Sequence, residues 1–294
     1  MTQLSTYKEK TVEAVRTSLL IVMLLGFCFF LYFIKSLLSV YFTTEHIRDN
    51  SRYILFAHML ITDTVYLFLC FFLAACSLYF VYLPFSVCYT TVAATTTSFI
   101  VTPYNLAVMS LERYVAICFP LRHAEICSVQ NTCIAVAVMW VVGLVSPTAE
   151  LIVLLLLVKK DVFSLKVQCS SMAIMIVPPQ NSLRFLSIVL SLSAVGTIHM
   201  LTYIKVVIAA KKVSSGTSSA SKAGRTVMLH AFQLLLCMTS LFSSFIDMTF
   251  ADSIVFLRMA FFFVFMFLPR FLSPLIYGLR DEVFRKYLKK LRSK

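Results

Sequence analysis

The chain has 294 residues, of which 60% are hydrophobic and only 13% are charged, and its formal net charge is +13. A soluble domain carries about twice that fraction of charged residues, so the composition excludes a water-soluble globular protein and predicts a membrane protein with several spans. Membrane topology and attraction to anionic lipid explain the positive charge, and no nucleic-acid partner is expected.

Charge-free runs mark the predicted spans in chain order. Thr17–Ile34 is an uncharged run of 18 residues, whereas Thr64–Leu111 is an uncharged run of 48 residues. Because a membrane helix needs about 20 residues, the long run, with Tyr53–Thr62 before it, predicts two helices joined by a short turn near Leu83-Pro84. Four further apolar runs follow, the last of them interrupted by Arg270. The predicted helices cover residues 15–38, 52–80, 86–118, 131–158, 183–210, 225–248 and 255–279.

The distribution of positive charge predicts how the bundle is oriented. An odd number of spans puts the two termini on opposite sides of the membrane. If the C-terminus is cytoplasmic, the inner segments carry 17 Lys and Arg and the outer segments carry eight. The positive-inside rule therefore predicts an extracellular N-terminus. The first apolar run lacks a small-residue cleavage site, so we expect an uncleaved anchor.

The last residues, "RDEVFRKYLKKLRSK", place apolar side chains at helical spacing between basic ones. The apolar positions are Val283, Phe284, Tyr287, Leu288 and Leu291. This pattern predicts an amphipathic helix over residues 281–292 that lies along the inner leaflet. A merely solvated basic tail would account for the charges but not for the regular apolar stripe. The expected class is thus an all-α membrane protein, one seven-transmembrane helix bundle over residues 1–294 with a short amphipathic C-terminal helix.

Only two of the nine cysteines, Cys88 and Cys169, fall in the predicted outer region. The outside is oxidising, so a disulfide between them is the favoured interpretation. Most of the others lie in or next to apolar runs, where packing is the usual explanation. Cys127 lies near the predicted inner surface and is expected to stay reduced.

The long uncharged stretch is followed directly by Glu112–Tyr114, a Glu-Arg-Tyr triplet at the predicted inner end of the third helix. Together with seven spans, Cys88 and Ser273–Tyr277, this triplet resembles the pattern of rhodopsin-like G-protein-coupled receptors. "MSLERYVAICFPLRH" resembles the signature of olfactory (odorant) receptors, and "KAGRTVMLHAFQLLLC" and "PRFLSPLIYGLRDEVFRKYL" are similar to the fish-type members of that family. The resemblance covers nearly the whole chain.

The resemblance implies a plasma-membrane receptor that binds a small odorant and activates a heterotrimeric G protein of the stimulatory or olfactory type, raising cyclic AMP. It implies no enzymatic activity, no cofactor and no metal. In the inactive state Arg113 pairs with Glu112 near helix six; in the active state Arg113 is released to contact Tyr203 and the G protein. The switch residues expected from the family pattern are Glu112, Arg113, Tyr114, Tyr203, His230, Pro274 and Tyr277.

The predicted ligand site has hydroxyls where a receptor for biogenic amines has an acid. The corresponding position, 18 residues before Arg113, is Thr95. Such a site suits a small, largely apolar ligand fixed by one or two hydrogen bonds. Helix packing explains each candidate as well as ligand contact does, and Thr and Ser commonly bond to their own helix. The candidates are Thr95, Thr96, Phe99, Ser187, Ser191, Phe242, Phe245 and Phe263. Glu150 and Asp247 would either bind a cationic group or face water.

Arg270 is the one cation deep in a predicted span, where an unpaired charge costs at least roughly 2.5–3.5 kcal/mol. Asp63 is the acid at comparable depth. In rhodopsin-like receptors these regions of helices two and seven adjoin, and an Asp there commonly helps to bind sodium. The resemblance therefore implies an Asp63–Arg270 pair in which the guanidinium takes the place of the cation. The alternative is that Arg270 snorkels or bonds only to backbone carbonyls.

Other classes fit the sequence less well. A transporter or channel would need several charges along a path through the membrane, and only Asp63 and Arg270 lie deep. An intramembrane enzyme would need a nucleophile with its base or paired metal ligands, and no HExxH or GxSxG motif occurs. A rhodopsin-like receptor for a non-odorant small molecule is the main alternative function.

Overall fold

The chain folds into a bundle of long helices, seen in a computed structural model that describes residues 2–158, 160–170, 173–213, 235, 267–268 and 270–272. Within these residues, five helices are long and apolar enough to cross a membrane. This finding confirms the helical membrane class expected from composition. The predicted amphipathic tail helix lies outside the described residues, as does nearly all of the predicted sixth and seventh helices.

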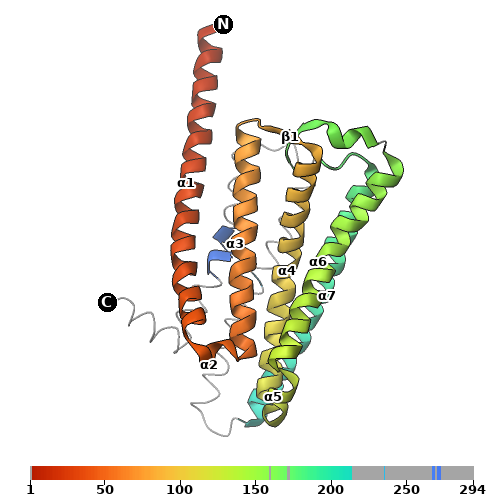
Figure 1. Cartoon of the computed structure of the whole chain (residues 1–294). Coiled ribbons are helices and arrows are strands. Elements are labelled where there is room, and N and C mark those ends of the chain that lie inside the picture. Colours follow the sequence, from red (N-terminus) through yellow and green to blue (C-terminus); the bar gives the residue numbers. More distant parts are fainter. Residues whose placement is uncertain are drawn as a thin grey trace.

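The first helix, α1, spans Thr2–Thr43. The predicted bounds of 15–38 are too narrow at both ends. No Gly or Pro interrupts the polar residues before position 17, and exposed Lys35 does not end the helix because its long side chain can extend along the surface. At about 1.5 Å per residue its 42 residues make α1 about 63 Å long. Its N-terminal part stands clear of the neighbouring helices (Figure 1).

A capping side chain sets the start of the second long helix, and a backbone turn sets its end. α1 is followed by the single turn α2 (Glu45–Arg48) and by α3 (Ser51–Leu78). The Asn50 side chain accepts a hydrogen bond from the Arg52 amide at 3.1 Å and caps the start of α3. α3 ends two residues before the predicted position, because the backbone turns at Phe80, whose φ of 53° lies in the left-handed region.

α4 (Phe85–Cys118) and α6 (Val129–Leu157) lie within two residues of their predicted bounds. The short helix α5 (His123–Ile126) connects them. α7 spans Pro178–Val213 and begins five residues before the predicted start. The Gln180 side chain accepts hydrogen bonds from two backbone amides just before the helix, and proline is well tolerated in the first helical turn.

A small antiparallel sheet interrupts the helical pattern at one end of the bundle. β1 (Tyr82–Pro84) pairs with β2 (Lys166–Gln168). The two helices are joined by a short connection near Leu83-Pro84 as predicted, since α3 ends at Leu78 and α4 begins at Phe85; the turn itself lies at residues 79–80, and Tyr82–Pro84 form a strand. Sequence periodicity could not reveal the strand, because three residues gain their hydrogen bonds only from a partner more than 80 positions away.

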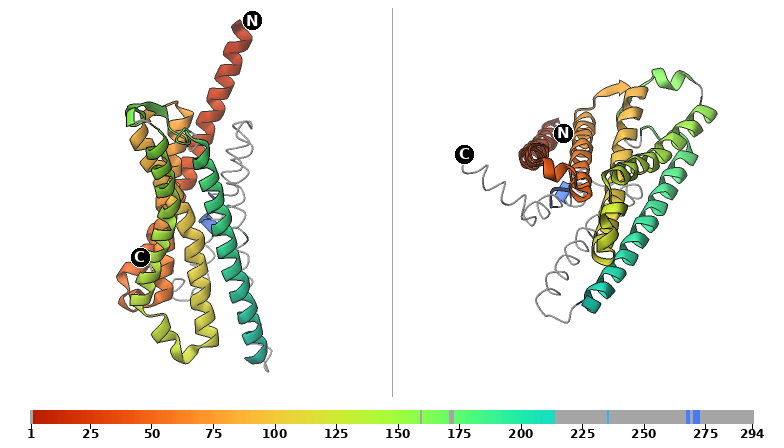
Figure 2. Two further views of the ribbon diagram at one scale, coloured as in Figure 1. Left: turned by 90° about the vertical axis from the view of Figure 1, so that its right-hand side faces the viewer. Right: turned by 60° about the horizontal axis from the view of Figure 1, so that its bottom comes forward.

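α4 lies at the centre of the described helices. It contacts α3, α6 and α7 along the bundle, and the two views in Figure 2 show these helices side by side with α1 outside α3. The contact with α6 is close at Gly143, where an added Cβ would lie 2.9 Å from a methyl carbon of Val101. A small residue is therefore needed at this crossing.

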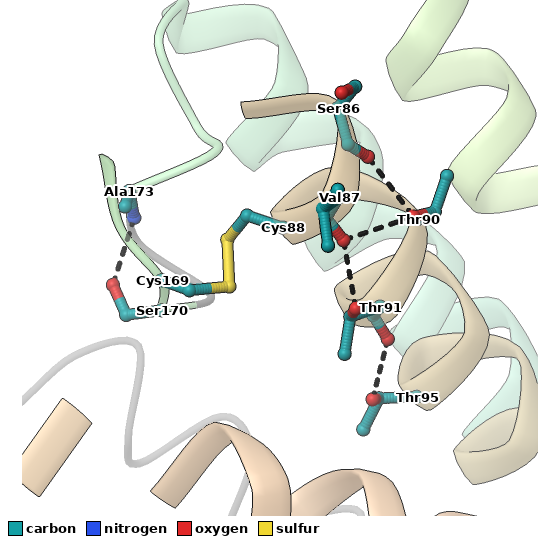
Figure 3. The surroundings of a disulfide bond; sticks show 9 residues. All are labelled: Ser86, Val87, Cys88, Thr90, Thr91, Thr95, Cys169, Ser170 and Ala173. Atoms are coloured by element: carbon teal, nitrogen blue, oxygen red, sulfur yellow. Dashed lines mark hydrogen bonds between the residues drawn. A yellow bond between two sulfur atoms is a disulfide. The ribbon is translucent and has the colours of Figure 1, made fainter. Parts of the chain in front are cut away.

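The two ends of the bundle differ in chemistry. At the end that carries β1 and β2, Cys88 of α4 forms a disulfide with Cys169, which follows β2 directly (Figure 3). This bond confirms the predicted pairing. At the opposite end, α4 finishes just after Glu112. We call these the disulfide end and the Glu112 end.

We expect Cys88→Ser to lower surface expression or ligand response. The bond ties the segment after α6 to the central helix, and loss of a native disulfide typically costs about 2–4 kcal/mol. Cell-surface labelling measures the first effect. Cys133→Ser removes an exposed free thiol and is the matched control.

The bond itself is tested by differential alkylation with peptide mapping. In folded, unreduced receptor neither Cys88 nor Cys169 should react until a reductant is added. Rapid labelling of both thiols before reduction contradicts the assignment.

Candidate functional site

Of the two predicted ligand hydroxyls of α4, those of Thr95 and Thr96, the Thr95 hydroxyl is used within its own helix. Thr91 donates to the Val87 carbonyl and Thr95 donates to the Thr91 carbonyl, each at 2.8 Å (Figure 3). A threonine that donates its proton in this way can only accept a hydrogen bond from a ligand. Both residues are half-buried, as is Thr96. α4 therefore offers methyl groups, the acceptor oxygen of Thr95 and the hydroxyl of Thr96 near the disulfide end.

The predicted serines of α7 differ from these threonines. Ser187 is half-buried and Ser191 is buried. Neither side chain makes a hydrogen bond within the part of the chain that the structure describes, so both keep a proton to donate. The three predicted phenylalanines, Phe242, Phe245 and Phe263, lie outside the described residues.

A buried ion pair links α6 to α7 at the disulfide end. Arg184 Nε donates to Glu150 Oε1 at 3.1 Å, and Arg184 Nη2 donates to Glu150 Oε2. Ser146 also donates to Oε1, and Gln180 donates to the Glu150 backbone carbonyl. Of the two alternatives expected for Glu150, facing water is wrong because the residue is buried; it binds a cationic group, which is the guanidinium of Arg184 in this chain. The sequence did not reveal this pair, because its members are 34 positions apart.

Tyr89 of α4 adds a neutral contact beside this pair. Its hydroxyl donates to the carbonyl of Pro147 in α6 at 2.6 Å. Tyr89 follows the disulfide cysteine by one residue, so the disulfide, this hydrogen bond and the Glu150–Arg184 pair join α4, α6 and α7 at the same end of the bundle.

The middle of the bundle holds a second ion pair. Arg270 Nε lies 3.2 Å from Asp63 Oδ1, and both side chains are at most 5% exposed. Thr102 of α4 donates to the same oxygen at 2.9 Å. The guanidinium carbon lies 3.7 Å from the centre of the Tyr66 ring and 5.4 Å from that of Phe99. Two aromatic faces and a carboxylate thus surround the cation.

Phe99, one of the predicted ligand residues, packs against the ion pair in the middle of the bundle. Its ring is buried and packs 5.9 Å from that of Tyr66. Phe99 therefore shields the ion pair, whereas Thr95 lies one turn closer to the disulfide end. Below the pair, Trp140 donates from Nε1 to His58 Nε2 at 2.9 Å and links α6 to α3.

At the Glu112 end, one carboxylate contacts two basic side chains. Glu112 Oε2 lies 3.7 Å from Arg113 Nε, and Glu112 Oε1 lies 3.0 Å from His123 Nε2. His123 begins α5, so this contact joins the loop helix to α4. Sequence reasoning anticipated the Glu112–Arg113 contact but missed His123, which the sequence places eleven positions away in an irregular segment.

A second polar cluster is centred on Ser110, two residues before Glu112 on α4. Ser110 donates to the Ala107 carbonyl at 2.8 Å, so its oxygen must accept the 3.1 Å bond from His199 Nδ1 of α7. Of the predicted switch residues, Tyr114 stacks edge-on against Phe119, and Tyr203 is 45% exposed. His230, Pro274 and Tyr277 lie outside the described residues.

Cys127 lies next to the same end of the bundle, after α5. Burial raises the pKa of its thiol above the usual value, and the Glu112 carboxylate raises it further. A protonated thiol is a poor nucleophile. A thiol that stays protonated is consistent with the expectation that Cys127 remains reduced.

Comparison with known proteins gives two matches. Residues 37–277 match the family described as 7 transmembrane receptor (rhodopsin family). The sequence is also 34% identical over 294 residues to Odorant receptor 131-2 of Danio rerio, an alignment that covers 97% of this chain and 88% of that protein.

The Asp63–Arg270 contact predicts a specific mutational pattern. Asp63→Asn and Arg270→Gln should each destabilise the receptor by about 3–5 kcal/mol, because each leaves a buried charge without its counter-ion. The double variant should recover part of the loss. Thermal unfolding of the purified receptor measures all three. Single defects that simply add would show that the two side chains are not coupled.

The same contact predicts how the receptor responds to sodium. Because the guanidinium already neutralises the Asp63 carboxylate, exchanging Na⁺ for K⁺ should not change the unfolding temperature. Arg270→Gln should make the receptor sensitive to this exchange. Sodium-dependent stabilisation of the unaltered receptor contradicts the assignment.

Proposed function

The chain belongs to the rhodopsin family of seven-transmembrane receptors, and from that membership we propose that it is an odorant receptor that raises cyclic AMP through a stimulatory, olfactory-type G protein. The observation that carries the proposal is the 34% identity to an odorant receptor along 97% of the chain. Family membership already makes the chain a multi-pass membrane receptor with a small-molecule ligand and a G-protein partner.

We propose that the disulfide end faces the extracellular side of the plasma membrane and that the C-terminus is cytoplasmic. Disulfides form and persist in oxidising compartments, which supports an extracellular position for the bond between Cys88 and Cys169. The Glu112 end carries the basic residues Arg48, Arg52 and Arg122 in or next to its connecting segments, as the positive-inside rule requires of the cytoplasmic side.

The proposed ligand site lies between α4 and α7 in the half of the bundle nearer the disulfide. Thr95 and Thr96 on α4, and Ser187 and Ser191 on α7, are the described residues assigned to it. Methyl groups and a few hydroxyls suit a small, largely apolar molecule. Phe242, Phe245 and Phe263 complete the proposed site from the last two helices.

The signalling mechanism follows from the contacts of Glu112. In the structure this carboxylate contacts both Arg113 and His123. The contact with Arg113 favours the state in which the arginine side chain stays beside Glu112. In the active state Arg113 moves to Tyr203 and the G protein. An odorant shifts this equilibrium only by as much as it binds the active arrangement more tightly.

Arg113→Ala should abolish the odorant-evoked rise in cyclic AMP while surface protein remains, because the group that contacts the G protein is lost. The measurement is a cyclic-AMP reporter in cells that express the receptor with an olfactory G protein. Arg122→Ala is the control, since Arg122 is exposed and pairs only weakly with Glu125. A full response from Arg113→Ala contradicts the mechanism.

His123→Ala should raise the basal cyclic-AMP signal. Removing the imidazole takes away one of the two basic partners of Glu112 and weakens the contact between α5 and α4. Basal signal per receptor at the surface is the quantity to compare with the unaltered protein. A basal signal that falls, or that does not change, argues against a restraining role for this contact.

A further inference from the structure

All buried charges in the described part of the chain are neutralised by partners of the same chain. The buried charged side chains are Asp63, Glu112, Glu150, Arg184 and Arg270. Each of them lies in an ion pair. The pair that matters for the ligand is Glu150–Arg184, because it lies at the disulfide end on helices that border the proposed site.

Glu150 and Arg184 form a bidentate ion pair that is shielded from solvent. The two side chains are 2% and 7% exposed, and both carboxylate oxygens accept from the guanidinium. Ser146 donates a further hydrogen bond to Oε1. Such a bidentate contact combines charge with fixed geometry. A ligand that took either partner would leave the other charge buried without its counter-ion, which is strongly unfavourable.

Arg184 of this pair lies on the same helix as two of the proposed ligand residues. Arg184, Ser187 and Ser191 follow one another at helical spacing on the inward face of α7, where Ile188 is also buried. The serines come one and two turns after the arginine and retain protons to donate. This face of α7 therefore presents two neutral hydroxyl donors next to the Arg184 guanidinium, whose charge Glu150 already neutralises.

We propose that the site selects a neutral ligand with a hydrogen-bond acceptor, such as a carbonyl or an ether, and that Glu150 is the residue that keeps Arg184 from selecting a carboxylate. Ser187 and Ser191 donate to the acceptor of the ligand. Glu150 determines specificity without touching the ligand, by supplying the counter-ion of Arg184. This assignment rests on the proposed odorant-receptor function.

Replacing Glu150 by Gln separates charge from size. The amide has nearly the volume of the carboxylate and can still accept from Arg184, but it no longer neutralises the guanidinium. A carboxylate on the ligand can then supply the missing negative charge. Arg184→Gln is the mirror-image variant, in which the retained carboxylate of Glu150 favours an ammonium group.

The test uses ligands of one chain length and different head groups: octanal, octanol, octanoate and octylamine. Each is applied to full-length receptor, with cyclic AMP measured in cells and thermal unfolding measured on purified protein. The unaltered receptor should be activated or stabilised only by the neutral members. In Glu150→Gln, octanoate should gain about ten-fold or more relative to octanal, the factor expected for one charge-assisted hydrogen bond.

Glu125→Gln is the matched control, because it removes the carboxylate of an exposed ion pair at the other end of the bundle. Its order of preference should equal that of the unaltered receptor. If Glu150→Gln is retained inside the cell, octanoate added during expression should restore it to the surface, whereas octanol should not.

Three results overturn the proposal. The first is an unaltered receptor that prefers octanoate or octylamine to the neutral members. The second is a folded Glu150→Gln receptor whose order of preference does not change or that octanoate does not stabilise. The third is a retained variant that octanoate fails to restore. Thermal unfolding measures ligand binding without a G protein. If the unfolding measurements show the expected order of preference but cyclic AMP does not rise, the result contradicts the proposed function and leaves the proposed role of Glu150 intact.

Discussion

The constraint on which this structure depends is that a charge within the hydrocarbon has no water to hydrate it. Such a charge must therefore find its partner inside the bundle. The chain meets this requirement with two ion pairs across its helices, Asp63–Arg270 in the middle and Glu150–Arg184 at the disulfide end. Each pair joins residues of different helices, so neutralising the charges also brings those helices together.

The central helix connects the chemistry of the two ends. From Cys88 to Arg113, α4 runs 25 residues, or about 37 Å at 1.5 Å per residue. Its first turn is covalently bonded to the segment after α6, its middle donates from Thr102 to the Asp63 carboxylate, and its last two turns carry Glu112. A rigid element of this kind can transmit a rearrangement at the ligand end only if its contacts have two alternative states. The contacts of Glu112 are the ones proposed to change.

Hydroxyl groups in this bundle serve two purposes that sequence cannot distinguish. Thr91 and Thr95 donate to their own helix, while Ser187 and Ser191 make no hydrogen bond in the described part of the chain. In the proposed site α7 contributes the hydroxyls of Ser187 and Ser191, whereas α4 contributes methyl groups, the acceptor oxygen of Thr95 and the hydroxyl of Thr96.

The sequence alone determined the membrane class, the family resemblance and the Cys88–Cys169 bond, because these depend on composition, on local motifs and on which side of the membrane a residue lies. It also placed α3, α4 and α6 within two residues, since long uncharged runs end where charges meet water. Only the tertiary structure decided that Glu150 pairs with Arg184, that His123 contacts Glu112 and that residues 82–84 form a strand. Each of these interactions joins residues from different elements, and a pattern read along one chain segment carries no information about which segment will lie beside it.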